Sequence, residues 1–387
     1  MPFIDEARLD DDQLAQLDSR QTLRSLASAG AQVRHAIDLA GEAGLGRLMG
    51  GERPRSVLVA ALGGSSVVAN VLELLAEPGS PVPVQTRHNL PLPGWVGALD
   101  LVVAVSQSGR AEGPLALAAE ASRRGASLLT VGAPDSPLAD ISARARGVHV
   151  DVPAGTSSRT TLWAMLTPVV LAAHALGMVD AGPLVFARVA DRLDQQAGLF
   201  RPSSETFVNP AKTLACELAE GVPVVLGDGP LTGVAACRAA AMITRTARIP
   251  ATWGELPDAA SQVVACFDGP YTDAGLTSAA VSGPADIFAD PYLDGAPAPK
   301  LRLLLLRDDG SERVDERART LADAVAQTAR DVGVRVSEHG TEAGHALERL
   351  AAHIALTDFA ATYLALGLGM DPGLSPHVAD LRDRTRG

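Results

Sequence analysis

The chain of 387 residues has few aromatic residues, few cysteines and almost no lysine, and these shortages narrow the classes of protein it can belong to. Aromatic residues make up only 3%, so we expect a core of aliphatic side chains. The three cysteines, Cys216, Cys237 and Cys266, have no C-x-x-C spacing. This argues against a zinc site and a disulfide framework, and for a reducing compartment. Lys212 and Lys300 are the only lysines, so arginine supplies nearly all the positive charge.

Excess positive charge and long apolar runs are also missing. The net charge of −12 argues against a sequence-independent nucleic-acid binder. It still allows a small phosphorylated ligand, because one anion needs only a local positive site. No uncharged apolar run reaches the roughly 18 residues of a membrane span. The residues from Met1 to Arg8 lack the apolar segment of a signal peptide. We therefore expect a cytoplasmic protein that binds neither nucleic acid nor a membrane.

Apolar runs alternate with helical patterns in both halves of the chain, and the length suggests about two domains. This alternation predicts an α/β fold of two tandem, doubly wound parallel-sheet domains, each an αβα sandwich. We expect strands at 56–62, 82–86, 99–105, 127–131, 148–152, 222–226, 301–306 and 335–338, and a loop at 254–258. The predicted domains are 1–180, a helical arm plus the first sheet, and 209–387, with a linker helix at 181–208 and an irregular insertion at 268–299.

A predicted strand ends in the turn Ser106-Gln107-Ser108-Gly109-Arg110, which leads into a helix at Glu112. Such a turn directs free N–H groups and the helix dipole toward an anion. The serine hydroxyls and Arg110 add donors and a cation. Gly63-Gly64-Ser65 repeats the arrangement after the first strand. We therefore predict a phosphate site of Gly63, Gly64, Ser65, Ser106, Ser108, Gly109 and Arg110. The alternative is that the serines only cap helices.

Several short motifs, in their order along the chain, resemble the sugar isomerase (SIS) fold. More closely, they resemble the bifunctional phosphoglucose/phosphomannose isomerase family and its actinobacterial relatives. The motifs are Gly63-Gly64-Ser65, Ser106-Gln107-Ser108-Gly109, Pro153-x-Gly155…Arg159, Asn209-Pro210-Ala211-Lys212, Thr357-Asp358-Phe359, Tyr363-Leu364-Ala365 and Gly369-Met370-Asp371-Pro372.

The resemblance implies two tandem SIS-type domains in a homodimer that binds a phosphorylated hexose. The family interconverts glucose 6-phosphate, mannose 6-phosphate and fructose 6-phosphate through an enediol, without a metal or cofactor. By resemblance, Ser65, Ser106 and Ser108 fall in the phosphate site. Arg159 falls where the family's enediolate-facing arginine lies, although an ordinary salt bridge would also account for it.

The chain departs from the family around the catalytic base. Our alignment places Val263 where the family has its catalytic carboxylate, and no histidine occurs between Val264 and Arg307 to open the sugar ring. The nearest carboxylates, Glu255 and Asp258, are the candidate bases, unless they are solvated loop acids. The candidate imidazoles, unless they are surface residues, are His339 and His345. A non-catalytic phosphosugar sensor or regulatory partner protein is therefore the alternative function.

Overall fold

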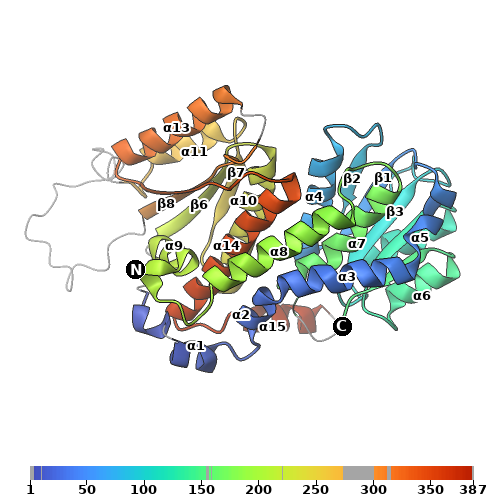
Figure 1. The fold of residues 1–387 in the computed structure, drawn as a ribbon, viewed down its shortest axis with the longest axis horizontal. Helices are drawn as coiled ribbons and strands as arrows, with labels where there is room; N and C mark the ends of the chain where they lie inside the picture. The colour runs from blue at the N-terminus through green and yellow to red at the C-terminus, as the bar shows by residue number, and fades with distance from the viewer. Residues whose placement is uncertain are drawn as a thin grey trace, which may run out of the picture. The chain divides into compact units, whose positions relative to one another are not determined.

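The computed structural model describes residues 4–9, 11–153, 157, 159–219, 221–272, 300–311 and 315–385. They form two compact units, one of residues 25–195 and one of residues 1–24 together with 196–387. Each unit contains one parallel sheet, and we call them the five-stranded and the four-stranded unit (Figure 1). Most of the predicted insertion, residues 273–299, lies outside the described residues.

The five-stranded sheet is entirely parallel, with the strand order β2-β1-β3-β4-β5. Its strands are β1 (Val57–Ala61), β2 (Val84–Arg87), β3 (Leu101–Ser106), β4 (Ser127–Gly132) and β5 (Val148–Asp151). Both β1 and β3 are buried along their whole length, as expected for continuous apolar runs covered on two faces. This confirms the predicted fold class for the first half of the chain.

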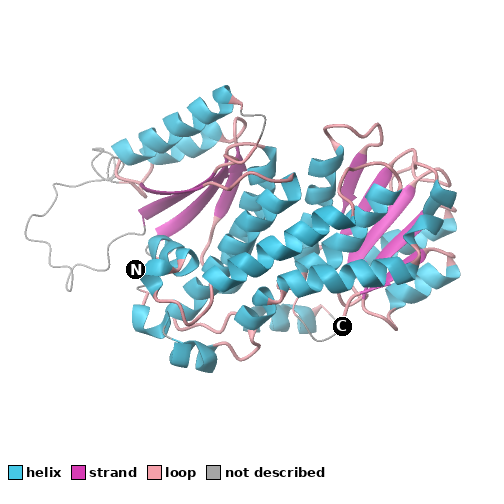
Figure 2. Ribbon diagram, viewed as in Figure 1, coloured by secondary structure: helices cyan, strands magenta, loops and turns pink. Residues whose placement is uncertain are grey.

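Helices cover both faces of this sheet (Figure 2). Leu58, Val102 and Leu128 face one layer and pack with Leu117. The helices of the unit are α3 (Ala29–Ala43), α4 (Val67–Ala76), α5 (Glu112–Arg123), α6 (Pro137–Arg144), α7 (Leu162–Ala175) and α8 (Pro183–Leu199), with 3₁₀ turns at Leu45–Gly51 and Gly63–Ser65. The chain runs from β1 to β2 on one side and then returns to β3 on the other. The strand order therefore reverses between β1 and β3, which is where ligands bind in open α/β sheets.

The four-stranded sheet is also parallel, with the order β7-β6-β8-β9. Its strands are β6 (Gly221–Gly227), β7 (Thr252–Glu255), β8 (Lys300–Leu306) and β9 (Arg335–His339). Strand β7 is short, and two of its four residues are exposed. Because it lacks a buried apolar run, the sequence indicated a loop at 254–258, and this was wrong for residues 254 and 255.

Helices α11 and α13 pack on one face of this sheet through a buried apolar cluster that includes Leu303, Leu305, Val263 and Val325. Helix α10 packs on β6 and also contacts α14 (Figure 1). The helices associated with the unit are α1 (Asp11–Leu17), α2 (Thr22–Ala27), α9 (Pro210–Leu218), α10 (Pro230–Met242), α11 (Ala260–Ala265), α13 (Glu316–Asp331), α14 (Ala346–Gly367) and α15 (Pro376–Arg384). Short turns lie at Glu6–Leu9, Thr206–Val208 and Cys266–Asp268, and a π-helical turn lies at Ile243–Ala247.

The start of the chain belongs to the four-stranded unit and not, as predicted, to the first sheet. The Nζ of Lys212 is the anchor, since it donates to the carbonyl oxygens of Leu9 (2.6 Å), Pro202 (2.7 Å) and Ser204 (2.8 Å). The Asp5 N–H also donates to the carbonyl of Gly367. The contact with Leu9 joins residues about 200 positions apart, so no local pattern predicts it.

Helix α14 is long and apolar enough, by composition, to cross a membrane. However, 94% of the helix's apolar 18-residue segment is buried inside the protein, as in the core helix of a globular domain. Its burial by the four-stranded unit explains its hydropathy.

Candidate functional site

The two serine turns lie next to each other at the switch between β1 and β3. Ser65 is in the 3₁₀ turn after β1, and Ser106 is the last residue of β3. The buried Oγ of Ser65 donates to the carbonyl of Leu62 (3.0 Å) and lies 3.5 Å from that of Val105. The hydroxyl proton of Ser65 is thus directed at backbone carbonyls, and this side chain fixes the first turn to the end of β3.

The turn after β3 is held by its own serines. The Ser106 Oγ accepts a hydrogen bond from the Ala111 N–H (3.2 Å), and the Ser108 Oγ accepts one from the Arg110 N–H (3.3 Å). Each hydroxyl therefore keeps its own proton, for which the described residues provide no hydrogen-bond acceptor. Ser108 and Arg110 are exposed, whereas Ser106 is buried. Two hydroxyl donors and one cation thus belong to a single short turn.

Gly109 allows this turn to form. Its φ is +62°, which favours glycine, and a Cβ there would overlap the side chain of Ser136. Its N–H donates to Ser106 O (2.8 Å), and its carbonyl accepts from the Leu138 N–H (3.2 Å). The turn is therefore fixed against the start of α6.

Helix α5 begins directly after this turn. Its N-cap, Ala111, has no side chain able to satisfy the first N–H groups of the helix. Those groups and the positive end of the helix dipole lie beside the Ser106 turn, and this arrangement suits an anion. Gly113 lies against the backbone of His88, because a Cβ at position 113 would overlap the His88 carbonyl oxygen.

His88 is a residue at this edge that the sequence analysis missed. It directly follows β2, and its Nδ1 lies 2.8 Å from the carbonyl oxygen of Ala61, the last residue of β1. Its position after a predicted strand was a visible signal. However, only the strand order of the sheet shows that β2 lies beside β1 and so brings His88 to this edge.

Arg159 lies between β5 and α7, and its N–H donates to the Ser157 Oγ (3.3 Å). It is partly buried and precedes Thr160, whose Oγ1 accepts a hydrogen bond from Ser25. Gly155, in the motif around it, lies outside the described residues. The role of Arg159 toward an enediolate therefore stays a prediction.

In the four-stranded unit, a carboxylate occupies the corresponding switch between β6 and β8. Asp228 follows β6 and accepts hydrogen bonds from the Thr232 hydroxyl (2.8 Å) and from the Asp308 N–H (3.1 Å). Burial raises the pKa of Asp228. The protein's own acidic group thus takes the backbone and hydroxyl donors that an anion would need. The prediction of an anion site therefore stays with the serine turns of the five-stranded unit.

Glu255 and Asp258 lie at the carboxyl end of β7. Glu255 is its last residue, and its carboxylate packs against Gly233 in the first turn of α10. Asp258 is exposed in the following turn. Val263, the position aligned with the family's base, is buried in the apolar cluster with Leu303. A carboxylate at position 263 would be costly there, because that cluster offers it no polar partner.

The two candidate histidines, His339 and His345, and a third histidine of the same unit, His353, differ in their surroundings. His339 is the last residue of β9, and burial lowers its pKa, an effect that the Glu217 carboxylate opposes. His345 caps α14, because its Nδ1 accepts the Leu347 N–H (3.2 Å). His353 is buried within α14, with its Nε2 3.2 Å from Arg307 O. His345 and His353 thus have structural partners, and His339 is the remaining candidate.

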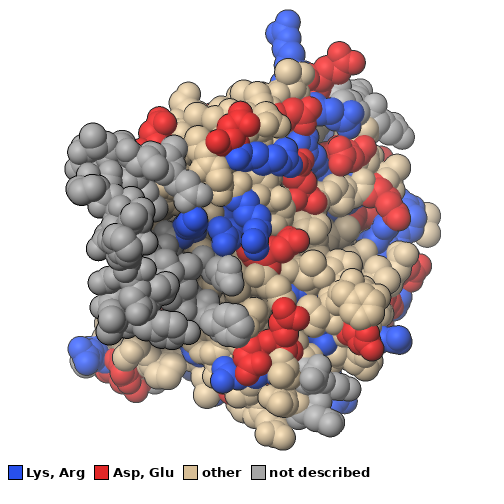
Figure 3. Space-filling view, turned by 90° about the vertical axis from the view of Figure 1, so that its left-hand side faces the viewer, with Lys and Arg blue, Asp and Glu red and all other residues tan. Residues whose placement is uncertain are grey.

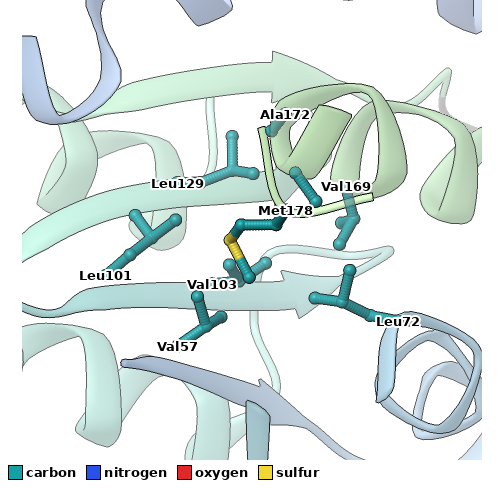
Figure 4. A pocket seen from close by; sticks show the side chains of 9 residues that line it. Val57, Leu72, Leu101, Val103, Leu129, Val169, Ala172 and Met178 are labelled. Atoms are coloured by element: carbon teal, nitrogen blue, oxygen red, sulfur yellow. The ribbon is translucent and has the colours of Figure 1, made fainter. Parts of the chain in front are cut away.

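Three further features of the described residues were candidates for a binding site. Basic and acidic side chains are intermingled among the described residues of the face in Figure 3. No group of three or more His, Cys, Asp and Glu side chains in the described ranges is arranged to hold a metal ion. A small cavity between the five-stranded sheet and α7 is lined only by apolar side chains, including Val57, Leu101 and Met178 (Figure 4). It has no groups to bind a phosphate and is a packing gap.

The sequence is similar to known sugar-phosphate isomerases. Residues 207–385 match the family described as bacterial phospho-glucose isomerase C-terminal SIS domain. A bifunctional phosphoglucose/phosphomannose isomerase of Caldicellulosiruptor bescii is 24% identical over 195 residues. That match covers 50% of this chain and 57% of the relative, so it spans little more than half of that protein.

Solved structures share the fold over nearly the whole chain. A hypothetical protein of Thermus thermophilus has a TM-score of 0.67 at 14% identity, covering 98% of this chain and 93% of the other. A glucose-6-phosphate isomerase like protein of the same organism has a TM-score of 0.54 at 19% identity, covering 97% and 98%. At such identities the likeness shows the fold alone. Residues 207–385 thus resemble the bacterial phospho-glucose isomerase C-terminal SIS domains, and the chain is similar to the bifunctional phosphoglucose/phosphomannose isomerases.

Proposed function

We propose that this chain is a phosphosugar isomerase-like protein that binds a hexose 6-phosphate at the carboxyl edge of its five-stranded sheet. The observation that carries the proposal is the position of the two serine turns on either side of the β1–β3 switch, joined by Ser65. The family match and the similarity to the bifunctional phosphoglucose/phosphomannose isomerase of C. bescii support a sugar phosphate as the ligand. Glucose, mannose and fructose 6-phosphate are the proposed ligands.

The chemistry of a phosphoryl group fits this edge. The dianion of a sugar phosphate's phosphoryl group only accepts hydrogen bonds, so its site must supply donors and positive charge. The hydroxyl protons of Ser106 and Ser108, the first N–H groups of α5 and the guanidinium of Arg110 are such donors. Gly63 and Gly64 have no side chains and leave the backbone of the first turn accessible to the ligand. Ser65 takes a positioning role.

Isomerisation through an enediol would need further groups. A base must move a proton between C1 and C2 of the sugar, and a cation must stabilise the enediolate oxygen. Glu255 and Asp258 are the proposed bases, His339 the proposed ring-opening group and Arg159 the proposed cation. No metal or cofactor enters this scheme.

Binding without turnover is the second candidate function, and the burial of Val263 favours it. Loss of a general base typically costs about 10²–10⁴ in rate. A protein that kept the phosphate donors without the base would act as a phosphosugar sensor or as a regulatory partner of another protein.

Two measurements on the full chain test these functions. Calorimetric titration with fructose 6-phosphate should show saturable binding, which Ser106→Ala and Arg110→Ala each weaken, whereas Ser80→Ala, a change elsewhere in the same unit, should leave it unchanged. A coupled assay for glucose 6-phosphate and mannose 6-phosphate then separates the functions. Turnover that Glu255→Gln or Asp258→Asn abolishes would support the isomerase. Binding without turnover would support the sensor, and absence of binding would refute the proposal.

We also propose that the protein is cytoplasmic, as its composition indicates, and a homodimer, as the resemblance implies. Light scattering coupled to size-exclusion chromatography measures its mass in solution, and a monomeric mass would refute the dimer.

A further inference from the structure

His88 contacts both parts of the proposed phosphosugar site, the turn after β1 and the start of α5. It directly follows β2, whose last residue, Arg87, pairs with Ala60 of β1. Its ring reaches the end of β1 at Ala61, where the turn with Gly63, Gly64 and Ser65 begins. Its backbone touches the first turn of α5 at Gly113. The residue is therefore held between the β1 turn and the helix that starts after the Ser106 turn.

The contact with Ala61 fixes which ring nitrogen carries a proton. The Nδ1 of His88 lies 2.8 Å from the carbonyl oxygen of Ala61, and a carbonyl oxygen can only accept. Nδ1 must therefore donate, and in the neutral ring Nε2 carries a lone pair. Nε2 has no hydrogen-bond partner among the described residues, and His88 is exposed. The protein orients this ring and leaves one acceptor unused.

We infer that the Nε2 of His88 accepts a hydrogen bond from a sugar hydroxyl of the bound hexose phosphate. This inference rests on the proposed function, since it assumes a phosphosugar at the Ser106 turn. The phosphoryl dianion of a sugar phosphate has no proton to donate, so within the bound ligand only the sugar hydroxyls can donate to the Nε2 lone pair. His88 is thus a specificity-determining residue that favours a phosphosugar over inorganic phosphate, whereas Ser106, Ser108 and Arg110 bind the phosphoryl group common to both.

Two substitutions separate the functions of the two ring nitrogens. The Nδ2 of asparagine occupies nearly the position of the histidine Nδ1, so His88→Asn keeps a donor for Ala61 O and removes Nε2. Glutamine extends one atom further, so His88→Gln returns an amide to the Nε2 position. His35→Asn is the matched control, because His35 is an exposed histidine on α3 of the same unit.

The experiment is calorimetric titration of the full chain and these variants with fructose 6-phosphate and, separately, with inorganic phosphate. We expect His88→Asn to weaken fructose 6-phosphate binding roughly 3- to 10-fold, the value of one hydrogen bond, without changing phosphate binding. His88→Gln should recover part of the loss, and His35→Asn should match the wild type. Thermal melting of each variant checks that the fold is intact.

Other outcomes overturn the inference. An equal loss for both ligands would place His88 at the phosphoryl group or in the fold alone, and no loss for fructose 6-phosphate would remove it from the site. In both cases, binding by the wild type would leave the proposed function standing. If the wild type bound no fructose 6-phosphate, the proposed function itself would fail, and the inference with it.

Discussion

Arg238 of α10 and Asp358 of α14 form a bidentate ion pair that is almost completely buried. The Nε of Arg238 lies 3.1 Å from each carboxylate oxygen, and one terminal nitrogen lies 2.6 Å from Oδ2. The two side chains are only 4% and 5% exposed. Asp358 belongs to the motif Thr357-Asp358-Phe359, which contributed to the family resemblance. Its carboxylate binds Arg238 inside the four-stranded unit, which gives it a structural role.

Removing one member of this pair should strongly destabilise the protein, because the other buried charge loses this bidentate counter-charge. We expect Asp358→Ala to lower the free energy of unfolding by about 3–5 kcal/mol, measured by urea denaturation. The double variant Arg238→Met with Asp358→Leu should recover most of that loss. A cost below about 1 kcal/mol for the single variant would contradict this reading of the pair.

Lys212 should hold the first residues of the chain against the four-stranded unit. Lys212→Met removes three hydrogen bonds and leaves the carbonyls of Leu9, Pro202 and Ser204 without this donor. We expect a loss of about 2–4 kcal/mol of stability and faster proteolysis near Leu9 than near β1. Equal protease resistance of the variant and the wild type would show that Lys212 is not the anchor.

The stability of the four-stranded unit should fall at acidic pH because of His353. Burial lowers the pKa of His353 to about 4, whereas in the unfolded chain a histidine titrates near 6.5. Between these values the unfolded state binds a proton that the folded state does not. The stability from this group is therefore complete above about pH 6.5 and is lost as the pH falls toward 4, by about 3 kcal/mol.

Urea denaturation at pH 7 and pH 4 measures this dependence. His353→Gln, which keeps a donor for Arg307 O, should show a smaller loss between the two pH values than the wild type by about that amount. Because all other groups titrate in both proteins, the difference isolates His353. Identical pH dependence would refute a neutral, buried imidazole.

Gly113 should tolerate no side chain, because its Cα lies against the backbone of His88. Gly113→Ala would force α5 away from the segment after β2, so we expect a loss of more than about 1 kcal/mol and weaker fructose 6-phosphate binding. Gly97→Ala, where a Cβ would meet nothing within 4 Å, is the matched control and should change stability by no more than about 0.5 kcal/mol. Thermal melting and calorimetric titration measure both effects.

The sequence by itself determined the architecture and the position of the serine turns. Buried parallel strands need continuous apolar runs, and these runs predicted β1, β3 and β8. The turn chemistry after β1 and β3 is also local, so Ser65 and Ser106 were identified without a structure. Short β7, with two exposed residues, has no such run and was missed as a strand.

Only the tertiary structure decided which distant groups meet. His88 reaches Ala61 because β2 pairs with β1, and Lys212 holds Leu9 across about 200 residues of chain. The same holds for Asp228, which takes the donors at the β6–β8 switch, and for Val263, which the fold buries in apolar surroundings. The spacing of apolar residues in the sequence indicates where a helix or strand lies. These contacts depend instead on the order of the strands in the sheet and on how helices pack against it.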